Sequence, residues 1–427
     1  MAIELRSYIN GNWHDGVRLF EDVNPANPAE VVAQVSMGST QLAVEAVEAA
    51  RAASAGWRKT PAPLRGEILR KAADLLEQRA DTVGRDLTRE EGKTLVEGIG
   101  ETKRAVAILR YYAGLTLDAD GETYPSFSPR TFLYARREPI GVVAVITPWN
   151  FPIAIPTWKI APALAYGNTI VWKPAELVPL TAAHLLQALV DAGLPQGVLN
   201  MILGKGSEVG EVLTTHERVD AITFTGSNSV GRSIQLKAIG HGKKVQLEMG
   251  GKNPAVVLAD ADLAHAAEHV ARGAFLSAGQ KCTATSRVIV EKPVLGEFQE
   301  RLAALAQNWK LGDPLDKDTK VGPVVSQAQM QTVLDYIEIG GKEGAHVLAG
   351  GGRATALGDG YYVKPTVLTN LDRESRVARE EIFGPVAAIL PASSYDEAVA
   401  LANDTPFGLT ASLFTNDLTK ALRFVRD

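Results

Sequence analysis

The feature that most constrains the fold is a regular alternation of short apolar runs with helix-like segments between residues 142 and 238. Val142 to Thr147 is rich in β-branched residues, which is typical of a buried strand. Pro179 and Gly193 flank one intervening segment, the arrangement expected for a helix. Strands alternating with helices of this length predict a parallel, doubly wound α/β sheet. The predicted strands are 142–147, 169–172, 198–203 and 221–224. One predicted helix ends at 164–167, and the others cover 179–192, 207–214 and 227–238.

The flanking regions differ in pattern. Tyr8 to Trp13 predicts a hairpin with Asn-Gly as its turn, and the rest of the first hundred residues is expected to be mainly helical. The alternating aromatic residues of 122–137 predict a strand pair. A second strand-helix series follows Gly250-Gly251, which we take as a domain boundary. The expected helices are 40–57, 64–87, 97–113, 263–275, 294–307, 327–339 and 417–427, and the expected late strands are 256–258, 287–290, 365–368, 386–390 and 409–414.

Composition limits the class of protein. The chain has 427 residues, 46% hydrophobic and 22% charged, which suggests two or three globular domains. A single cysteine cannot form an internal disulfide and fits a reducing, cytoplasmic compartment. The net charge of -5 and the lack of a basic block argue against a nucleic-acid partner. We expect neither a signal peptide in residues 1–10 nor a membrane span, since four prolines interrupt the most apolar stretch, 140–165.

The only cysteine, Cys282, follows Gly279 and adjoins Lys281. Glycine allows a close backbone approach to a ligand, and the lysine could favour the thiolate, although its side chain could point away. A buried, inert cysteine is the competing interpretation. Glu248 ends an alternating run and precedes two glycines, a suitable place for a general base. Asn150, between Trp149 and Phe151, could donate an amide hydrogen bond to an oxyanion. A solvated Glu248 and a turn asparagine are the alternatives.

Two glycine loops each follow a predicted strand and open a predicted helix, the context of a phosphate site. They cover 204–210 and 225–231, and neither matches G-x-G-x-x-G, so each is weak as a fingerprint. Glu176, just past a strand end, could bind ribose hydroxyls or cap a helix. His265 and His269 have zinc-ligand spacing, but no third ligand completes a site, so we expect no metal.

Together and in order, these motifs resemble the aldehyde dehydrogenase superfamily. The resemblance extends from the N-terminal hairpin to Asp427. It is carried by the segments 146–152, 173–176, 224–227, 247–254, 279–282 and Glu381-Ile382-Phe383-Gly384-Pro385.

The resemblance implies a Rossmann-type dinucleotide domain (1–116 and 140–250), oligomerisation strands (117–139) and an α/β catalytic domain (251–427). Cys282 would be the nucleophile and Glu248 the general base, and the Asn150 amide and the Cys282 N–H would form the oxyanion hole. Lys173 would contribute to catalysis and, with Glu176, bind the adenosine ribose. The other residues implied to bind the cofactor are Ile146, Thr147, Pro148, Trp149, Gly206, Gly210, Phe224, Thr225, Gly226, Ser227, Val230, Met249, Gly250, Glu381 and Phe383.

The resemblance also implies a thioester route from aldehyde to acid and a homo-oligomer, dimer or tetramer. Glu176 would repel a 2′-phosphate, which favours NAD, while Lys173 keeps NADP possible. The stretch 280–287 resembles bacterial semialdehyde dehydrogenases of the α-ketoglutaric semialdehyde type. Succinate-semialdehyde enzymes place an arginine where this chain has Trp158, so we rank α-ketoglutaric semialdehyde above succinic semialdehyde and aromatic aldehydes.

The family pattern continues roughly 50–60 residues past Asp427, including a Pro-Phe-Gly-Gly motif and the last oligomerisation strand. An inactive truncated relative, or a cysteine acyl-transferase or esterase without redox chemistry, therefore stays open as an alternative. The Glu381 and Phe383 motif argues against the esterase.

Overall fold

The computed structural model describes residues 3–118 and 120–427. These residues divide into two compact units. The first comprises residues up to Val23, Val31–Glu90 and Gly98–Glu248, and the second comprises Asn24–Glu30, Glu91–Glu97 and Met249–Asp427. Each unit has a hydrophobic core of its own.

The first unit is built on a seven-stranded sheet in the order β12-β11-β8-β9-β10-β2-β3. Its strands are β2 (Ser7–Ile9), β3 (Asn12–His14), β8 (Val142–Ile146), β9 (Thr169–Lys173), β10 (Leu199–Met201), β11 (Ala221–Thr225) and β12 (Lys244–Glu248). The strands from β12 to β10 are parallel, and β2 joins β10 in the antiparallel sense. All five residues of β8 are buried, as expected for a strand covered by helices on both faces.

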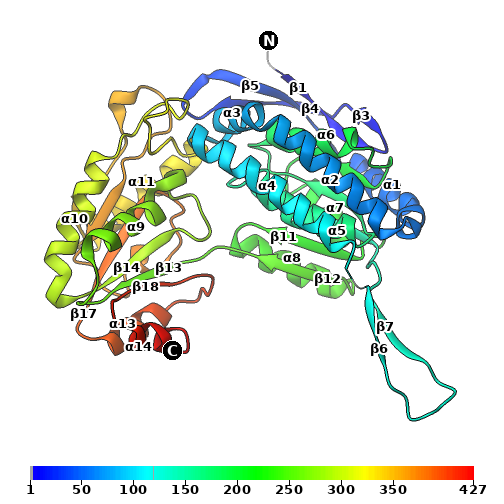
Figure 1. Ribbon diagram of the computed structural model, residues 1–427. Coiled ribbons are helices and arrows are strands. Elements are labelled where there is room, and N and C mark those ends of the chain that lie inside the picture. Colours follow the sequence, from blue (N-terminus) through cyan, green and yellow to red (C-terminus); the bar gives the residue numbers. More distant parts are fainter. Residues whose placement is uncertain (1–2, 119) are drawn as a thin grey trace. The chain divides into compact units, whose positions relative to one another are not determined.

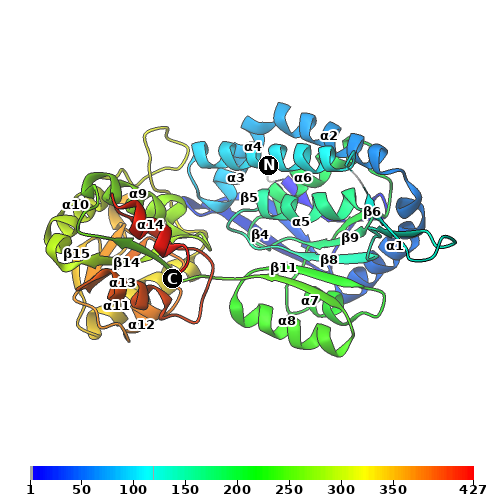
Figure 2. The same cartoon turned by 60° about the horizontal axis from the view of Figure 1, so that its bottom comes forward.

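Helices cover both faces of this sheet. They are α1 (Thr40–Lys59), α2 (Ala62–Gln78), α3 (Ala80–Glu91), α4 (Leu95–Leu115), α5 (Ala154–Ala165), α6 (Pro179–Asp191), α7 (Val209–Thr215) and α8 (Asn228–Gly240). Helices α5 and α6 pack together with α2, while α7 packs against α1 and α8. Figure 2 shows α4 and α6 over one face and α7 and α8 on the opposite face. The chain therefore winds outward from β8 in one direction and then in the other, which is the doubly wound α/β topology that the sequence predicts.

Two small sheets complete the strand inventory of the N-terminal half. One has the order β1-β5-β4, with β1 (Ile3–Leu5), β4 (Arg18–Asn24) and β5 (Asn27–Met37). The other is an antiparallel pair of β6 (Gly121–Tyr124) and β7 (Leu133–Arg136), which projects from the first unit in Figure 1. This pair confirms the strands predicted in 122–137.

The second unit contains a six-stranded sheet in the order β15-β16-β17-β14-β13-β18. The strands are β13 (Asn253–Val257), β14 (Thr285–Glu291), β15 (His346–Ala349), β16 (Thr366–Thr369), β17 (Val386–Ala392) and β18 (Ser412–Phe414). The helices are α9 (Leu263–Phe275), α10 (Leu295–Asn308), α11 (Gln327–Lys342), α12 (Arg376–Arg379), α13 (Tyr395–Asn403) and α14 (Leu418–Phe424), with short 3-10 turns at Leu276–Gly279, Lys292–Val294 and Thr355–Leu357. Only β15 pairs in the antiparallel sense.

One local prediction was wrong. The predicted helix 64–87 is two helices, because Arg79 leaves the helical conformation at φ -99° and ψ 5° between α2 and α3. No glycine or proline marks this break. The first hundred residues are mainly helical, as predicted, but they also contain the strands β1, β4 and β5, which were not predicted. The N-terminal hairpin is confirmed, with Asn10 and Gly11 both at positive φ.

Candidate active site

The candidate residues fall into two groups, one in each unit. In the first unit, strand register brings five of them to one edge of the sheet. Ile146 pairs with Lys173 on one side and Phe224 on the other, and Thr225 pairs with Glu248. All of these residues lie at the carboxyl ends of parallel strands. They therefore surround the point between β8 and β11 where the strand order reverses, the position at which α/β sheets bind ligands.

The loop after β8 carries Asn150 and is fixed from both sides. Thr147 N–H donates to the Lys173 carbonyl at 3.1 Å, and its hydroxyl accepts from the Trp172 indole at 3.0 Å. At the far end, Glu101 Oε1 accepts the N–H groups of Ile153 and Ala154 at 3.0 and 3.1 Å. These bonds hold the buried Asn150 between two anchored ends, while Pro148 and Trp149 are partly exposed. Sequence reasoning did not identify Glu101, a buried residue of α4.

Lys173 and Glu176 meet the first glycine loop. Glu176 Oε1 accepts the Gly206 N–H at 3.0 Å, and a methyl group at Gly206 would lie 3.9 Å from Lys173 Cε. Burial lowers the pKa of Lys173 to about 8, against the opposing effect of Glu176. Gly210 is buried in the first turn of α7. The two residues predicted to bind ribose therefore share one edge with the loop predicted to bind phosphate.

The second glycine loop leads into α8. Ser227 is the N-cap of this helix and accepts the Val230 N–H, and Gly226 N–H donates to the Glu248 carbonyl at 3.2 Å. A side chain at Gly226 would meet the Phe224 ring at 2.5 Å. Val230 is 48% exposed. A helix N-terminus with an open side is suited to an anionic group.

Lys159, on α5, is a residue that sequence reasoning missed. Its Nζ donates to Thr223 Oγ1 at 3.0 Å and to Gln246 Oε1 at 3.2 Å. Burial lowers its pKa to about 8, while the negative charge of Glu248 acts in the opposite direction. A lysine inside an apolar helix gave no signal, since only the tertiary fold places it near Glu248.

In the second unit, Cys282 lies in a tightly held loop and is partly exposed. Asn253 Nδ2 donates to the carbonyls of Cys282 at 2.7 Å and Ala284 at 3.0 Å. A methyl group at Gly279, which has φ +70°, would lie 2.2 Å from the Gly384 carbonyl oxygen, so glycine is required there. Lys281 Nζ donates to the Arg272 carbonyl at 3.1 Å. Its amine is therefore hydrogen-bonded to the end of α9.

Glu381 joins the cysteine loop through the glycine pair. Gly251 N–H donates to Glu381 Oε1 at 3.1 Å, and a methyl group at Gly251 would meet the Cys282 carbonyl oxygen at 2.8 Å. A methyl group at Gly250 would lie 1.9 Å from Glu381 Oε2. Phe383 has a positive φ of 56°, and its carbonyl accepts from Gln329 at 2.9 Å. The residues from Met249 to Gly251 thus begin the segment that brings Glu381 and Cys282 together.

Lys252, next in sequence, was also missed. Its side chain is buried, and its Nζ has no hydrogen-bond partner within the described residues. Burial lowers its pKa to about 7. Arg287 acts in the same direction, while Glu381 and Glu380 act in the opposite one.

The described residues contain no group of three or more potential metal-ligating side chains. His265 and His269 are both exposed on α9, with ring centroids 4.2 Å apart. Within the same residues, no helix is long and apolar enough to cross a membrane.

Comparisons with known proteins match nearly the whole chain. A family model described as "Aldehyde dehydrogenase family" covers residues 13–427. The chain is 46% identical to an alpha-ketoglutaric semialdehyde dehydrogenase of Bacillus subtilis, over 98% of this chain and 87% of that protein. It is 43% identical to a 2,5-dioxopentanoate dehydrogenase of Saccharolobus solfataricus, over 95% of this chain and 84% of that protein.

A solved structure gives the same result. The crystal structure of betaine aldehyde dehydrogenase from Staphylococcus aureus in complex with NAD+ superimposes with a TM-score of 0.96 and 37% identity. The match covers 99% of this chain and 84% of that chain.

Proposed function

This chain belongs to the aldehyde dehydrogenase family, and on that premise we propose that it oxidises an aldehyde to a carboxylic acid with NAD as the hydride acceptor. The observation that carries the proposal is the arrangement around Gly251. The N–H of Gly251 donates to the Glu381 carboxylate, and the Cys282 carbonyl oxygen lies so near that a methyl group on Gly251 would meet it at 2.8 Å. One short segment therefore lies beside both the loop of the proposed nucleophile and the proposed ligand of the nicotinamide ribose.

In the proposed reaction, the Cys282 thiolate attacks the aldehyde carbon and forms a C–S bond. The carbonyl oxygen becomes an oxyanion, which the Asn150 amide and the Cys282 N–H stabilise. Loss of one such donor typically costs about 3 kcal/mol of barrier. NAD, when bound, would accept the hydride from this carbon, and the oxyanion re-forms the C=O bond, so that a thioester remains on Cys282. Glu248 then takes a proton from water, whose oxygen attacks the thioester. The C–S bond breaks, the thiolate returns and the acid leaves.

The first unit supports the binding of a dinucleotide. Its strand order reverses between β8 and β11, where Ile146, Lys173 and Phe224 lie in register. Glu176 and Lys173 would bind the adenosine ribose, and Gly226 with Ser227 at the start of α8 would face the pyrophosphate. We assign 1–116 and 140–250 to the dinucleotide domain and 251–427 to the catalytic domain. The carboxylate of Glu176 favours NAD over NADP.

For the substrate we propose an aldehyde that carries a carboxylate, with α-ketoglutaric semialdehyde first. Two relatives are named for this compound, which is also called 2,5-dioxopentanoate. The chain also offers a cation. The exposed guanidinium of Arg104, on α4, lies 5.9 Å from the ring centre of the exposed Trp158. A cation held over an aromatic face can bind a carboxylate. Trp158 stands where succinate-semialdehyde enzymes place an arginine for the substrate carboxylate.

The test is the formation of reduced nicotinamide, followed by absorbance, with NAD and a panel of aldehydes. Wild type should turn over and Cys282→Ala should not, while Thr283→Ala, one residue away, serves as the matched control. Activity in Cys282→Ala would refute the thiol mechanism. Arg104→Met should raise KM for the semialdehyde but not for an uncharged aldehyde of similar length. Arg110→Met on the same helix, whose guanidinium already pairs with Asp74 and Glu77, should change neither.

We propose that the strand pair β6–β7 joins copies of this chain into a homo-oligomer, a dimer or tetramer. All residues of both strands are exposed, and Phe127, Phe132 and Tyr134 are at least 65% exposed. Exposed aromatic side chains on a projecting hairpin are typical of an interface. Light scattering should show an oligomer for wild type and a smaller species for Phe132→Lys. A reducing, cytoplasmic location is proposed because the single cysteine of the chain cannot form an internal disulfide.

A further inference from the structure

The backbone that leads into Cys282 is strained. Ser277, Ala278 and Gly279 follow one another with φ values of 56°, 51° and 70°. Only glycine adopts this left-handed conformation without a steric cost. Ser277 and Ala278 therefore remain there only if their surroundings hold them.

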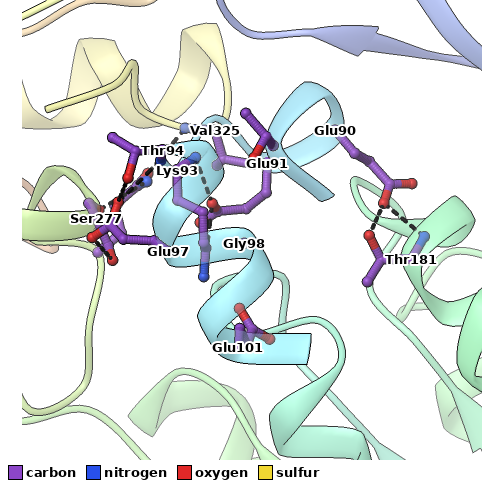
Figure 3. Close-up of polar contacts among 12 residues, drawn as sticks. Glu90, Glu91, Lys93, Thr94, Glu97, Gly98, Glu101, Thr181, Ser277 and Val325 are labelled. Atoms are coloured by element: carbon purple, nitrogen blue, oxygen red, sulfur yellow. Dashed lines mark hydrogen bonds and ion pairs between the residues drawn. The ribbon is translucent and has the colours of Figure 1, made fainter. Parts of the chain in front are cut away.

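Glu97 supplies a hydrogen bond to the first of these residues. Its Oε1 accepts the Ser277 hydroxyl at 2.9 Å, as Figure 3 shows. Its Oε2 accepts both the N–H and the hydroxyl of Thr94, at 3.0 and 2.9 Å. Thr94 and Glu97 have the spacing of a capping box at the start of α4. The bonds from Thr94 therefore fix Oε2 of Glu97, and Oε1 remains directed at Ser277.

The segment that carries Glu97 is itself anchored. Leu95 N–H donates to the Pro314 carbonyl at 2.9 Å, and Lys93 N–H donates to Glu91 Oε2 at 3.0 Å. Residues 91–97 belong to the same compact unit as the cysteine loop. Glu97 is therefore held by its own neighbours, and the Ser277 hydroxyl is positioned by a fixed group.

The other anchors of the loop act on different atoms. Gln280 Oε1 accepts the Val325 N–H at 3.0 Å, while its backbone N–H and its Nε2 donate to the Ser277 carbonyl at 3.0 and 3.4 Å. Asn253 binds the Cys282 carbonyl. Neither acts on the side chain of Ser277. The bond from Ser277 to Glu97 is the contact that connects the strained start of the loop to a charged group, and hydrogen bonds to charged groups are stronger than neutral ones.

We propose that Glu97 is a positioning residue for the nucleophile, because it holds Ser277 in the left-handed conformation from which the loop places the Sγ and N–H of Cys282. The inference rests on the proposed role of Cys282. Glu97 does not touch the reacting atoms and acts through Ser277. A displacement of about 1 Å at a reacting group can cost roughly 100-fold in rate, so the contact should affect kcat more than KM for NAD.

The experiment measures kcat, KM and the rate of Cys282 alkylation by iodoacetamide in Glu97→Ala, Ser277→Ala and the double variant. Since Cys282 is the only cysteine, alkylation reports on it alone. Each single variant should lose about 10- to 100-fold in kcat and in alkylation rate. The double variant should lose little more, because both changes remove one contact. Asp262→Ala, which removes the cap at the opposite end of α9, controls for a general loss of stability.

A glycine at position 277 separates positioning from other roles. Glycine takes the left-handed conformation without help, so Glu97→Ala with Ser277→Gly should recover most of the rate lost by Glu97→Ala. The inference is overturned if the glycine gives no recovery, if the single losses multiply in the double variant, or if Glu97→Ala behaves as Asp262→Ala does. Activity in Cys282→Ala would instead refute the proposed function, so the two failures are distinguishable.

Discussion

Asn253 connects the stability of the second unit to the placement of the cysteine, and we expect Asn253→Ala to damage both. The change removes the bonds from Nδ2 to the carbonyls of Cys282 and Ala284 and the bond that Oδ1 accepts from Thr410 N–H at 3.1 Å. A typical hydrogen bond contributes about 1 kcal/mol net. Three bonds therefore predict a loss of about 3 kcal/mol in the free energy of unfolding. Because Asn253 is 4% exposed, water would not readily replace them.

Urea denaturation followed by tryptophan fluorescence gives the free energy of unfolding, and alkylation of Cys282 reports on the loop. Asn403→Ala is the control, since Asn403 is an exposed asparagine of the same unit that binds one carbonyl. It should lose no more than about 0.5 kcal/mol. Asn253→Asp keeps the acceptor for Thr410 but sets a carboxyl group against two carbonyls, so it should be no better than alanine. A loss below about 1 kcal/mol in Asn253→Ala, with normal alkylation, would contradict the reasoning.

Three further outcomes are expected. Burial lowers the pKa of Lys159 in the folded chain to about 8, below its ordinary value of 10.5. Between these two pH values the unfolded chain binds more protons than the folded chain, so the free energy of unfolding of wild type should rise with pH there by about 3 kcal/mol. Lys159→Met should flatten that rise in urea titrations at several pH values, and an unchanged slope would refute it. Glu176→Gln should increase the ratio of NADP to NAD in kcat/KM, whereas a constant ratio would remove Glu176 from cofactor selection. Gly279→Ala should cost at least about 2 kcal/mol in unfolding experiments, because its methyl group would meet the Gly384 carbonyl; near-neutral stability would show that the loop can move.

The sequence by itself determined the elements with strong local signals. The β-branched run of β8 and the Asn-Gly turn after β2 were predicted because side-chain shape and backbone freedom act locally. The break at Arg79 was missed because no glycine or proline marks it, so local propensity does not predict the end of a helix there. The candidate residues Cys282, Glu248 and Asn150 were found through motifs in order, since each one alone had a common structural explanation.

Only the tertiary structure decided how these residues are held. Strand register, which depends on pairing across long sequence separations, brought Ile146, Lys173 and Phe224 to one edge of a sheet. The support of Cys282 by Asn253 and the bond of Ser277 to Glu97, 180 residues away, have no local pattern at all. Local residue types determine which backbone conformations are low in free energy. The positions of polar groups depend on contacts between distant segments, and those contacts exist only once the cores have packed.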